Sequence, residues 1–349
     1  MTSLPAELHE QDFAAVAARL CNRRVAGLSH VLGGGNNRIY RADFADGGRA
    51  ALKVYARHPG DARDRLGSEY GAVTFLAEHA PGWAPEPYGV DRVRGLAAYA
   101  WIDGTRIETC TLADCDRAIE FAGHLDALSR RRGAGALPPA SEPILSGSAA
   151  LAQVQRRLMR LEALIADEAD LGDFLSCELR PVLAQALQRA QTVYAAAGLS
   201  FDTDIPIEQR TLSPSDFGFH NAIRRADGEI VFIDFEYFGW DDPAKLVADF
   251  VQHPGMQLAR GHRRHVADGL ASVYARDTTF TARLSALAPL IGLRWCLIML
   301  NEFLPDVWRR RVLAGRASDH QLAKRTQLSK ARAKLAAVRA AIEEDKPWS

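Results

Sequence analysis

The sequence has no excess of charge of either sign. Its 349 residues contain 43 lysines and arginines against 43 aspartates and glutamates, so the formal net charge is +0. This balance excludes the chain-wide basic field that attracts nucleic acid, and we expect no nucleic-acid partner. With 48% hydrophobic and 25% charged residues, wholesale disorder is excluded too. The length suits two lobes or one large domain.

Cysteine is scarce and follows no pattern. The cysteines are odd in number, scattered and never spaced as Cys-x-x-Cys; they are Cys21, Cys110, Cys115, Cys177 and Cys296. This excludes a disulfide framework and argues against a zinc site. We expect reduced thiols that pack as small apolar side chains.

Long apolar runs and a secretion leader are also missing. The longest runs, residues 286–293 and 295–300, are separated by Arg294, and each is much shorter than a membrane span. Residues 1–11 contain acidic side chains and lack the apolar segment of a signal peptide. We therefore expect a cytoplasmic protein with no membrane partner.

The first hundred residues have the pattern of a small sheet with a leading helix and one inserted helix. Strand patterns cover residues 25–32, 38–44, 49–55, 88–92 and 96–102, and helical patterns cover residues 6–19 and 63–79. The tripeptide Asp46-Gly47-Gly48 between two of these strands is typical of a tight hairpin turn. We expect a first lobe over residues 1–103.

Residues 104–349 have a mostly helical pattern. Helical periodicity covers residues 111–129, 149–168, 176–197 and 243–346, with a Gly- and Pro-rich loop over residues 133–148. The exception is residues 213–238, where short strands alternate with tight turns. Functional residues favour loops on a rigid scaffold, so we expect the chemistry in this segment. The fold class predicted is α+β, with a small antiparallel sheet in the first lobe and a larger helical second lobe.

Polar residues in the segment 213–238 suit phosphoryl transfer. Asp216 and Asn221 lie in one short loop, and Asp234 ends an apolar strand. A kinase needs a carboxylate to orient the attacking hydroxyl and oxygen ligands for Mg²⁺. The alternative is that Asp216 and Asn221 satisfy backbone groups in a turn and that Asp234 caps a helix. These residues alone leave both interpretations open.

The first lobe contains the remaining parts of such a site. Lys53 lies in an apolar strand, where a lysine is costly unless it is paired or faces a cleft. Glu69, in the helix that follows, can pair with it. A glycine-rich turn over residues 33–37 can present backbone N–H groups to phosphates. It is neither a P-loop nor a dinucleotide-binding turn, because no Gly-Lys-Ser/Thr ending and no helix follows it.

Taken in order, these elements resemble the aminoglycoside phosphotransferase and choline kinase family, small-molecule enzymes with a protein-kinase-like fold. The resemblance runs from about residue 30 to about residue 255. It implies Asp216 as the catalytic base, and Asn221 and Asp234 as Mg²⁺ ligands. It also implies a set of nucleotide-binding residues: Gly34, Gly35, Asn36 and Asn37 over the phosphates, Lys53 and Glu69 at the α- and β-phosphates, and Tyr99, Trp101 and Ile102 at the adenine.

The sequence departs from the family pattern before the catalytic base. The family has His-Gly-Asp, whereas this chain has Pro214-Ser215-Asp216. The family histidine braces the backbone, so this change bears on loop geometry more than on chemistry. Gly218 also stands where many members have a histidine, and His220 comes two residues later.

The acceptor is less clearly indicated. Candidate contact residues in the second lobe are Glu236, Trp240, Asp242 and Glu302. Between residues 309 and 346, eleven basic residues outnumber four acidic ones, which slightly favours a neutral or anionic hydroxylated acceptor over a polycation. A solvated face of a terminal helix explains the same residues. We expect a sugar or a related polyol or amino-alcohol.

The prediction is therefore a Mg²⁺-assisted, ATP-dependent phosphotransferase acting on a hydroxyl of a small molecule, with GTP and the oligomeric state left open. One alternative is a pseudokinase that binds a nucleotide or a partner without transferring phosphate. Another is an interaction protein that uses its basic terminal helix to contact an acidic partner or RNA. A protein kinase is disfavoured, because no activation loop ending in Ala-Pro-Glu follows Asp234.

Overall fold

The computed structural model describes residues 10–31, 37–56, 63–256, 258–313 and 319–344. The chain divides into two compact units. The first unit contains Met1–Glu108, Arg130–Ser141 and Phe219–Gly239, and the second contains Thr109–Ser129, Glu142–Gly218 and Trp240–Ser349. The sequence-based boundary at residue 103 thus falls inside the first unit. The larger part of the loop 213–238, assigned from sequence to the second lobe, groups with the first unit.

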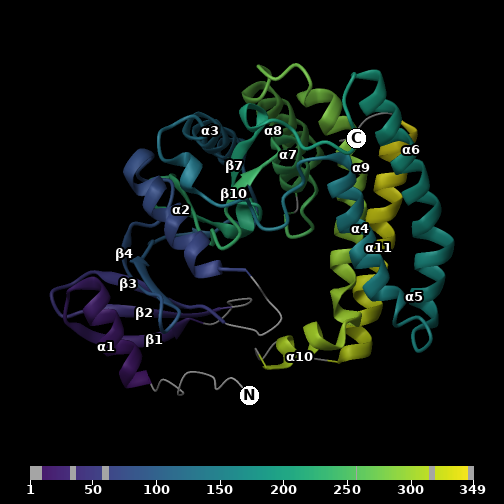
Figure 1. Ribbon diagram of the computed structural model, residues 1–349. Coiled ribbons are helices and arrows are strands. Elements are labelled where there is room, and N and C mark those ends of the chain that lie inside the picture. Colours follow the sequence, from purple (N-terminus) through teal and green to yellow (C-terminus); the bar gives the residue numbers. More distant parts are fainter. Residues whose placement is uncertain (1–9, 32–36, 57–62, 257, 314–318, 345–349) are drawn as a thin grey trace. The chain divides into compact units, whose positions relative to one another are not determined.

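The first unit is built on a five-stranded antiparallel sheet of order β1-β2-β3-β5-β4 (Figure 1). Its helices and strands are α1 (Glu10–Cys21), β1 (Val25–Val31), β2 (Arg38–Phe44), β3 (Arg49–Val54), α2 (Arg65–His79), β4 (Pro87–Asp91), β5 (Leu96–Ala100), β6 (Thr105–Arg106), η1 (Ala134–Ala136), η4 (Phe219–Asn221), β8 (Ala222–Arg224) and β9 (Ile230–Phe232).

Local sequence explains the central hairpin of this sheet. In β2 the buried side chains Tyr40, Ala42 and Phe44 alternate with more exposed ones, as in a strand with one face in the core. The turn to β3 has positive φ values of 82° at both Gly47 and Gly48, which glycine adopts without steric cost. The turn fixes the register, so Lys53 pairs with Ile39 on β2 and with Ala97 on β5.

Helix α1 covers one face of the sheet (Figure 1). It contributes Phe13, Val16 and Ala17 to a core that also contains Tyr40 and Leu52 from the sheet. The rings of Phe13 and Tyr40 lie 4.9 Å apart. Burial of such side chains supplies most of the free energy that holds a small unit together.

A second sheet in this unit joins β6, β8 and β9, all antiparallel. Gly104, just before β6, makes the pairing with β8 possible. A Cβ at this position would lie 2.3 Å from the carbonyl oxygen of Arg224, which no side chain tolerates. This sheet carries Asn221 before β8 and Asp234 after β9, so it positions two of the predicted site residues.

The second unit is mostly helical. Its elements are α3 (Leu112–Leu128), α4 (Gly147–Glu162), α5 (Ala169–Asp173), η2 (Phe174–Leu179), α6 (Arg180–Ala196), η3 (Ile207–Gln209), β7 (Thr211–Ser213), β10 (Gly239–Asp241), α7 (Pro243–Gln252), α8 (Arg260–Val273), α9 (Phe280–Met299), η5 (Leu300–Phe303), α10 (Pro305–Leu313) and α11 (His320–Glu343). Strands β7 and β10 form a two-stranded sheet. Helix α3 begins with a capping box, in which Thr111 and Asp114 satisfy each other's backbone N–H groups.

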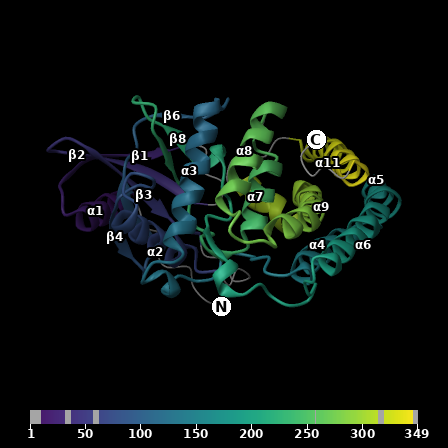
Figure 2. The same cartoon turned by 90° about the horizontal axis from the view of Figure 1, so that it is seen from above.

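Helix α9 is the central helix of the second unit, packed against α4, α6, α7 and α11 (Figure 2). By length and hydropathy alone, Phe280–Phe303 is long and apolar enough to cross a membrane. The sequence did not predict this long apolar segment, because Arg294 divides it into two shorter apolar runs. However, 78% of the most apolar window is buried, and Arg294 pairs with Asp249. The composition of this segment is thus that of a core helix.

The predicted fold class is confirmed, and the differences lie in the details. Residues 6–9 of the first predicted helix lie outside the described residues, and residues 176–197 begin with a π-helical turn before α6. The short elements α5, β6 and β10 were not predicted. Two- and three-residue strands have too few side chains to show a period, so sequence patterning cannot detect them.

Candidate active site

Lys53 is the centre of a charged cluster in the first unit. From β3, its Nζ lies 2.6 Å from Glu69 Oε2 in α2 and 2.5 Å from Asp234 Oδ1 after β9. Lys53 and Glu69 are buried, whereas the Asp234 side chain is 39% exposed. The structure thus brings together three residues that the sequence places in separate elements.

The charges of this cluster depend on one another. Burial lowers the pKa of Lys53, but the carboxylates of Asp234 and Glu69 outweigh it, and the pKa ends well above its usual range. Burial raises the pKa of Glu69 to about 7, against the opposing effect of the Lys53 ammonium. Lys53 is therefore a permanent cation, and Glu69 can gain a proton near neutral pH.

Tyr55 completes the surroundings of Glu69, and the sequence reading missed it. Its hydroxyl donates to Glu69 Oε2 at 2.8 Å and lies 2.8 Å from the hydroxyl of Tyr99. The only available signal was its position two residues after Lys53, on the same face of the strand. The side chain of Tyr99, a residue predicted to offer backbone groups to the adenine, is buried in this cluster.

The backbone after β5 leaves one segment for a nucleotide base. The amide of Ala100 donates to Glu86, and that of Trp101 donates to Arg49 at 3.4 Å. Within the described part of the chain, no hydrogen bond engages the amide of Ile102 or the carbonyl of Trp101. Of the predicted adenine contacts, Trp101 and Ile102 therefore have backbone groups left to offer.

The structure describes only the last residue of the glycine-rich turn. Gly34, Gly35 and Asn36 lie outside the described residues. Asn37 is described, and its Nδ2 donates a 2.6 Å hydrogen bond to Glu236 Oε2. Its Oδ1 accepts a 3.3 Å hydrogen bond from the amide of Ala56. The amide side chain therefore fixes the end of the turn within the unit.

Glu236 was predicted to contact the acceptor, and in the structure its carboxylate contacts two side chains of the first unit. Its carboxylate is buried between Asn37 and Arg65, whose Nη1 lies 2.9 Å from Glu236 Oε1. Both oxygens are used, so Glu236 is explained as an anchor. Arg65 was missed, although it lies four residues before Glu69 in α2 and so on the same helical face.

The geometry around Asp234 suits a divalent cation. Glu69, Asp234 and Glu236 have carboxylate oxygens within 4.8 Å of one another. Glu236 uses both carboxylate oxygens and the buried Glu69 uses Oε2, whereas the more exposed Asp234 has no hydrogen-bond partner for Oδ2 among the described residues. Such a hard, partly exposed oxygen is a ligand that Mg²⁺ prefers. Asp234 also has a positive φ of 68°, a strained conformation that is common at functional sites.

Asn221 is held beside the Asp234 strand through its backbone. Its carbonyl accepts a 2.9 Å hydrogen bond from the amide of Ile233, the residue before Asp234. The pairing of β8 with β9 continues this connection. Both predicted metal ligands thus belong to one small sheet of the first unit.

Asp216, the predicted base, lies in the second unit in a braced loop. The amide of Ser215 donates to Ser213 Oγ at 3.1 Å, and Lys245 Nζ donates to Ser215 Oγ at 3.1 Å. His253 Nε2 lies 3.3 Å from Asp216 Oδ1, and the Asp216 side chain is 32% exposed. Lys245 and His253 were missed, because neither lies near Asp216 in the sequence nor in a motif with it.

The three further acceptor candidates are buried in the second unit. Asp242 is fully buried, caps α7 through the amide of Ala244 at 2.7 Å, and pairs with Arg283 at 2.8 Å. Glu302 is buried and pairs with Arg311. Trp240 is buried in β10. Packing and capping account for the contacts of Asp242, while Oε2 of Glu302 is buried without a hydrogen-bond partner among the described residues.

The cysteines are all free, as expected. The spacing did not predict that Cys110, Cys115 and His262 come together within 4.8 Å in the second unit. Burial raises the pKa of Cys115 to about 12, which favours the neutral thiol over the thiolate that binds metals.

Comparison with known proteins gives matches in fold and none in sequence. No family model and no curated protein matches the chain. A spectinomycin phosphotransferase solved with ADP and spectinomycin matches with a TM-score of 0.64 at 10% identity, over 95% of this chain and 99% of that one. A choline/ethanolamine kinase family protein from Mesorhizobium loti matches with a TM-score of 0.55 at 19% identity, over 90% and 93%. A choline kinase from Streptococcus pneumoniae matches with a TM-score of 0.59 at 15% identity, over 94% and 99%.

At these identities the shared property is the fold. The chain has the α+β fold of solved small-molecule phosphotransferases and kinases, with an antiparallel sheet in its first unit and helices in its second.

Proposed function

We propose that this chain is a Mg²⁺-dependent phosphotransferase that moves the γ-phosphoryl group of ATP to a hydroxyl of a small molecule. The observation that carries the proposal is the Lys53–Glu69–Asp234 cluster: a buried lysine fixed by two carboxylates, one of which keeps an unbonded, partly exposed oxygen. Buried charges that serve stability alone have no need of an accessible oxygen.

In this mechanism Lys53 binds the α- and β-phosphates, and Glu69 holds its ammonium in place. Asp234 and Asn221 would hold Mg²⁺, which when bound neutralises phosphate charge and aligns the leaving group. The backbone of the glycine-rich turn, with Gly34, Gly35 and Asn36, would cover the phosphates. Ile102 and Trp101 would offer backbone groups to the base.

Asp216 acts on the acceptor. Its carboxylate orients the acceptor hydroxyl and receives its proton as the new O–P bond forms and the bond to the β-phosphate oxygen breaks, releasing ADP. His253, 3.3 Å from Asp216 Oδ1, holds that carboxylate in place. Positioning and charge stabilisation supply most of the rate enhancement in such reactions.

The solved neighbours support this choice of donor and acceptor class. The spectinomycin phosphotransferase was solved with ADP, and an amicoumacin kinase was solved with AMP-PNP and Ca²⁺. Both support an adenine nucleotide and a small-molecule acceptor for this chain, and the second supports a divalent cation. For the acceptor we propose a sugar or a related polyol or amino-alcohol.

A thermal-stability assay tests the nucleotide site. ATP at one hundred times its dissociation constant should stabilise the native protein by about 2.7 kcal/mol, and the shift should require Mg²⁺. Asp234→Asn should abolish the Mg²⁺-dependent part, because it removes the open carboxylate oxygen. The matched control is Asp227→Asn, the same change in the exposed turn between β8 and β9.

The outcomes separate the alternatives. A shift in the control that is lost in Asp234→Asn supports the site. No shift with ATP or GTP, with or without Mg²⁺, contradicts the proposal. A shift without any phosphate transfer across an acceptor panel would favour the pseudokinase.

A further inference from the structure

A cavity of about 590 Å³ lies within the second unit, between the turn that follows α7 and helices α9 and α11. His253 and Met299 line it, together with Arg263, Lys330 and Lys334. Its size suits a small molecule of the kind that a metabolite kinase phosphorylates.

His253 connects this cavity, here called the His253 cavity, to the predicted base. One ring nitrogen lies 3.3 Å from Asp216 Oδ1, and the other accepts a 3.0 Å hydrogen bond from the amide of Gly255. The ring also lies edge-on to Trp295 at 4.5 Å. A molecule in the cavity would therefore lie next to a histidine that is fixed against Asp216.

The lining has charge of one sign only. It contains three cationic side chains and no aspartate or glutamate. Lys334 Nζ donates to the carbonyl of Gln252 at 3.0 Å and pairs with no carboxylate among the described residues. Burial lowers the pKa of Lys334 to about 8, as expected for a cation without a counter-ion. Arg263 Nε is buried and has no hydrogen-bond partner in the described chain.

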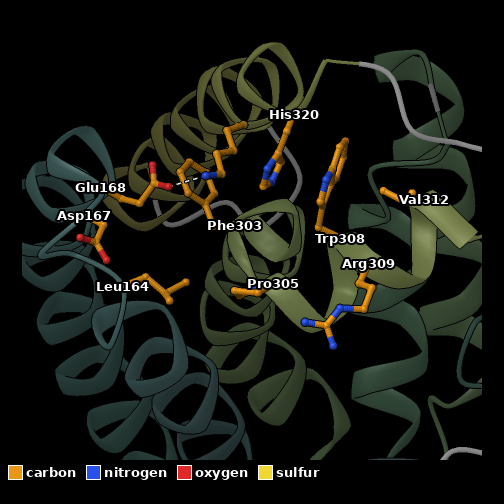
Figure 3. A pocket seen from close by; sticks show the side chains of 10 residues that line it. Leu164, Asp167, Glu168, Phe303, Pro305, Trp308, Arg309, Val312 and His320 are labelled. Atoms are coloured by element: carbon orange, nitrogen blue, oxygen red, sulfur yellow. Dashed lines mark hydrogen bonds and ion pairs between the residues drawn. The ribbon is translucent and has the colours of Figure 1, made fainter.

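Two other cations of α11 are already neutralised. Lys324 pairs with Glu168, and Arg332 lies 2.9 Å from Glu178. The first of these pairs lines a second cavity of about 450 Å³, shown in Figure 3, where Trp308 also stacks on His320 at 4.1 Å. That cavity has its lysine balanced by an internal carboxylate, so the unbalanced charge is a property of the His253 cavity.

We propose that the His253 cavity binds the phosphoryl acceptor and selects an acceptor that carries an anionic group, a carboxylate or a phosphate, besides its hydroxyl. The anion supplies the counter-ion that Lys334 and Arg263 lack, since a half-buried cation without a carboxylate partner gains from an opposite charge. The same lining repels polycationic acceptors. This inference rests on the proposed phosphotransferase activity and narrows its substrate class.

The first experiment measures binding and transfer with matched acceptor pairs that differ in charge. Gluconate is compared with glucose, and ribose 5-phosphate with ribose, while spectinomycin serves as a cationic acceptor. Binding is measured by calorimetry on the protein saturated with Mg²⁺ and ADP, and transfer is measured as ADP release from ATP. We expect kcat/KM to be at least about 10-fold higher for the anionic member of a pair, with a loss of this advantage as salt rises.

Two variants then test the residues. Lys334→Met and Arg263→Gln should each raise KM for the preferred anionic acceptor by about 10-fold while changing kcat little, because they remove binding charge and not the base. The control is Arg339→Met, an exposed cation of the same helix outside the cavity. Thermal melts verify that each variant is folded, and Arg263→Gln serves if Lys334→Met does not fold.

The result that overturns the inference is equal or better use of the neutral or cationic acceptors, or a KM for the anionic acceptor that both variants leave unchanged. If Mg²⁺-ATP still stabilises the protein and Asp216 still supports phosphate transfer, the inference fails alone. If nucleotide binding is absent as well, the proposed function fails with it.

Discussion

Each unit of the chain buries a group of charged side chains, and the two groups are built differently. In the first unit, Lys53 and Glu69 are buried, but Asp234 is 39% exposed and keeps Oδ2 unbonded among the described residues. The charges of the cluster are paired with one another, but Asp234 Oδ2 has no partner among the described residues. The cluster can therefore bind one more ligand.

In the second unit the charges are enclosed. Lys245 lies between Asp241 at 2.9 Å and Asp249 at 3.1 Å, and none of the three side chains is more than 3% exposed. Arg283 is fully buried between Asp242 and Asp277. Burial removes the solvation of such charged groups. Their ion-pair partners compensate for this loss only while every partner is present.

This contrast separates a structural ion-pair network from a binding site when both consist of buried acids and bases. Asp234, after β9, and Asp249, inside α7, are both acids among apolar neighbours in the sequence. The exposure of the carboxylate distinguishes the two residues, because a ligand can bind only an oxygen that it can reach. The predictions below follow from this: changes at accessible carboxylates should alter chemistry, and changes in the enclosed set should alter stability.

The largest expected effect is on turnover. Asp216→Asn should lower kcat by about 10²–10⁴-fold, because the amide cannot accept the hydroxyl proton, while nucleotide affinity and melting temperature stay nearly unchanged. The same change at the enclosed Asp249 should instead lower stability, since Lys245 and Arg294 lose their carboxylate. Steady-state kinetics and melting curves of both variants test this, and unaltered turnover in Asp216→Asn would remove Asp216 from the role of base.

Next comes stability in the enclosed set. Arg283→Met should lower the free energy of unfolding by about 3–5 kcal/mol, because Asp242 and Asp277 remain buried without their cation. The control is Arg160→Met, which removes an exposed pair with Asp306 and should cost less than about 1 kcal/mol. Urea unfolding measures both. Equal costs would show that enclosure is not what makes the Arg283 contacts important.

A smaller effect is expected from pH at the accessible cluster. Because the folded pKa of Glu69, about 7, lies above the ordinary 4.5, the native state holds a proton that the unfolded chain has lost between these values. Stability should therefore fall as pH rises from about 4.5 to about 7 and then level off. Urea unfolding from pH 5 to 8 should show this slope in the wild type and lose it in Glu69→Gln. Identical slopes would assign the titration to another group.

The smallest effect concerns Ser215. It has a positive φ of 66° at the position where the resembled family carries glycine, and it receives a hydrogen bond from Lys245. Ser215→Gly relieves the backbone strain and loses that bond, whereas Ser215→Ala loses the bond and keeps the strain. The glycine variant should be more stable than the alanine variant by about 1 kcal/mol. The reverse order in urea unfolding would show that the loop relaxes in solution.

Much of the secondary structure of the first unit could be predicted, because the sequence patterns that indicate it lie within short segments of the chain. The alternation in β2 and the paired glycines after it place Lys53 in a strand, and the spacing of Glu69 places it in the next helix. The strand that ends at Asp234 was equally readable. Their meeting in space was an inference from order along the chain, and the distances at Lys53 now support it.

Other features could not be predicted, since they depend on contacts between distant segments. Nothing near Asp216 signals His253, which reaches it from the turn after α7. The grouping of residues 219–239 with the first unit also has no local signature, because tertiary contacts alone define it. The ion pairs of Glu236 with Arg65 and of Asp242 with Arg283 also have no local signature, because their partners are distant in the sequence.

The hydrogen bond between Asn37 and Glu236 has a consequence for evolution and engineering. The two residues are 199 positions apart, yet the end of the glycine-rich turn depends on both. A change at Asn37 leaves a buried oxygen of Glu236 without its donor, and a change at Glu236 leaves the half-buried amide of Asn37 without its acceptor, so the two should change together among descendants of this gene. A library that randomises the turn should therefore vary Glu236 in the same clones. Otherwise turn sequences that need a different residue at position 236 will be lost.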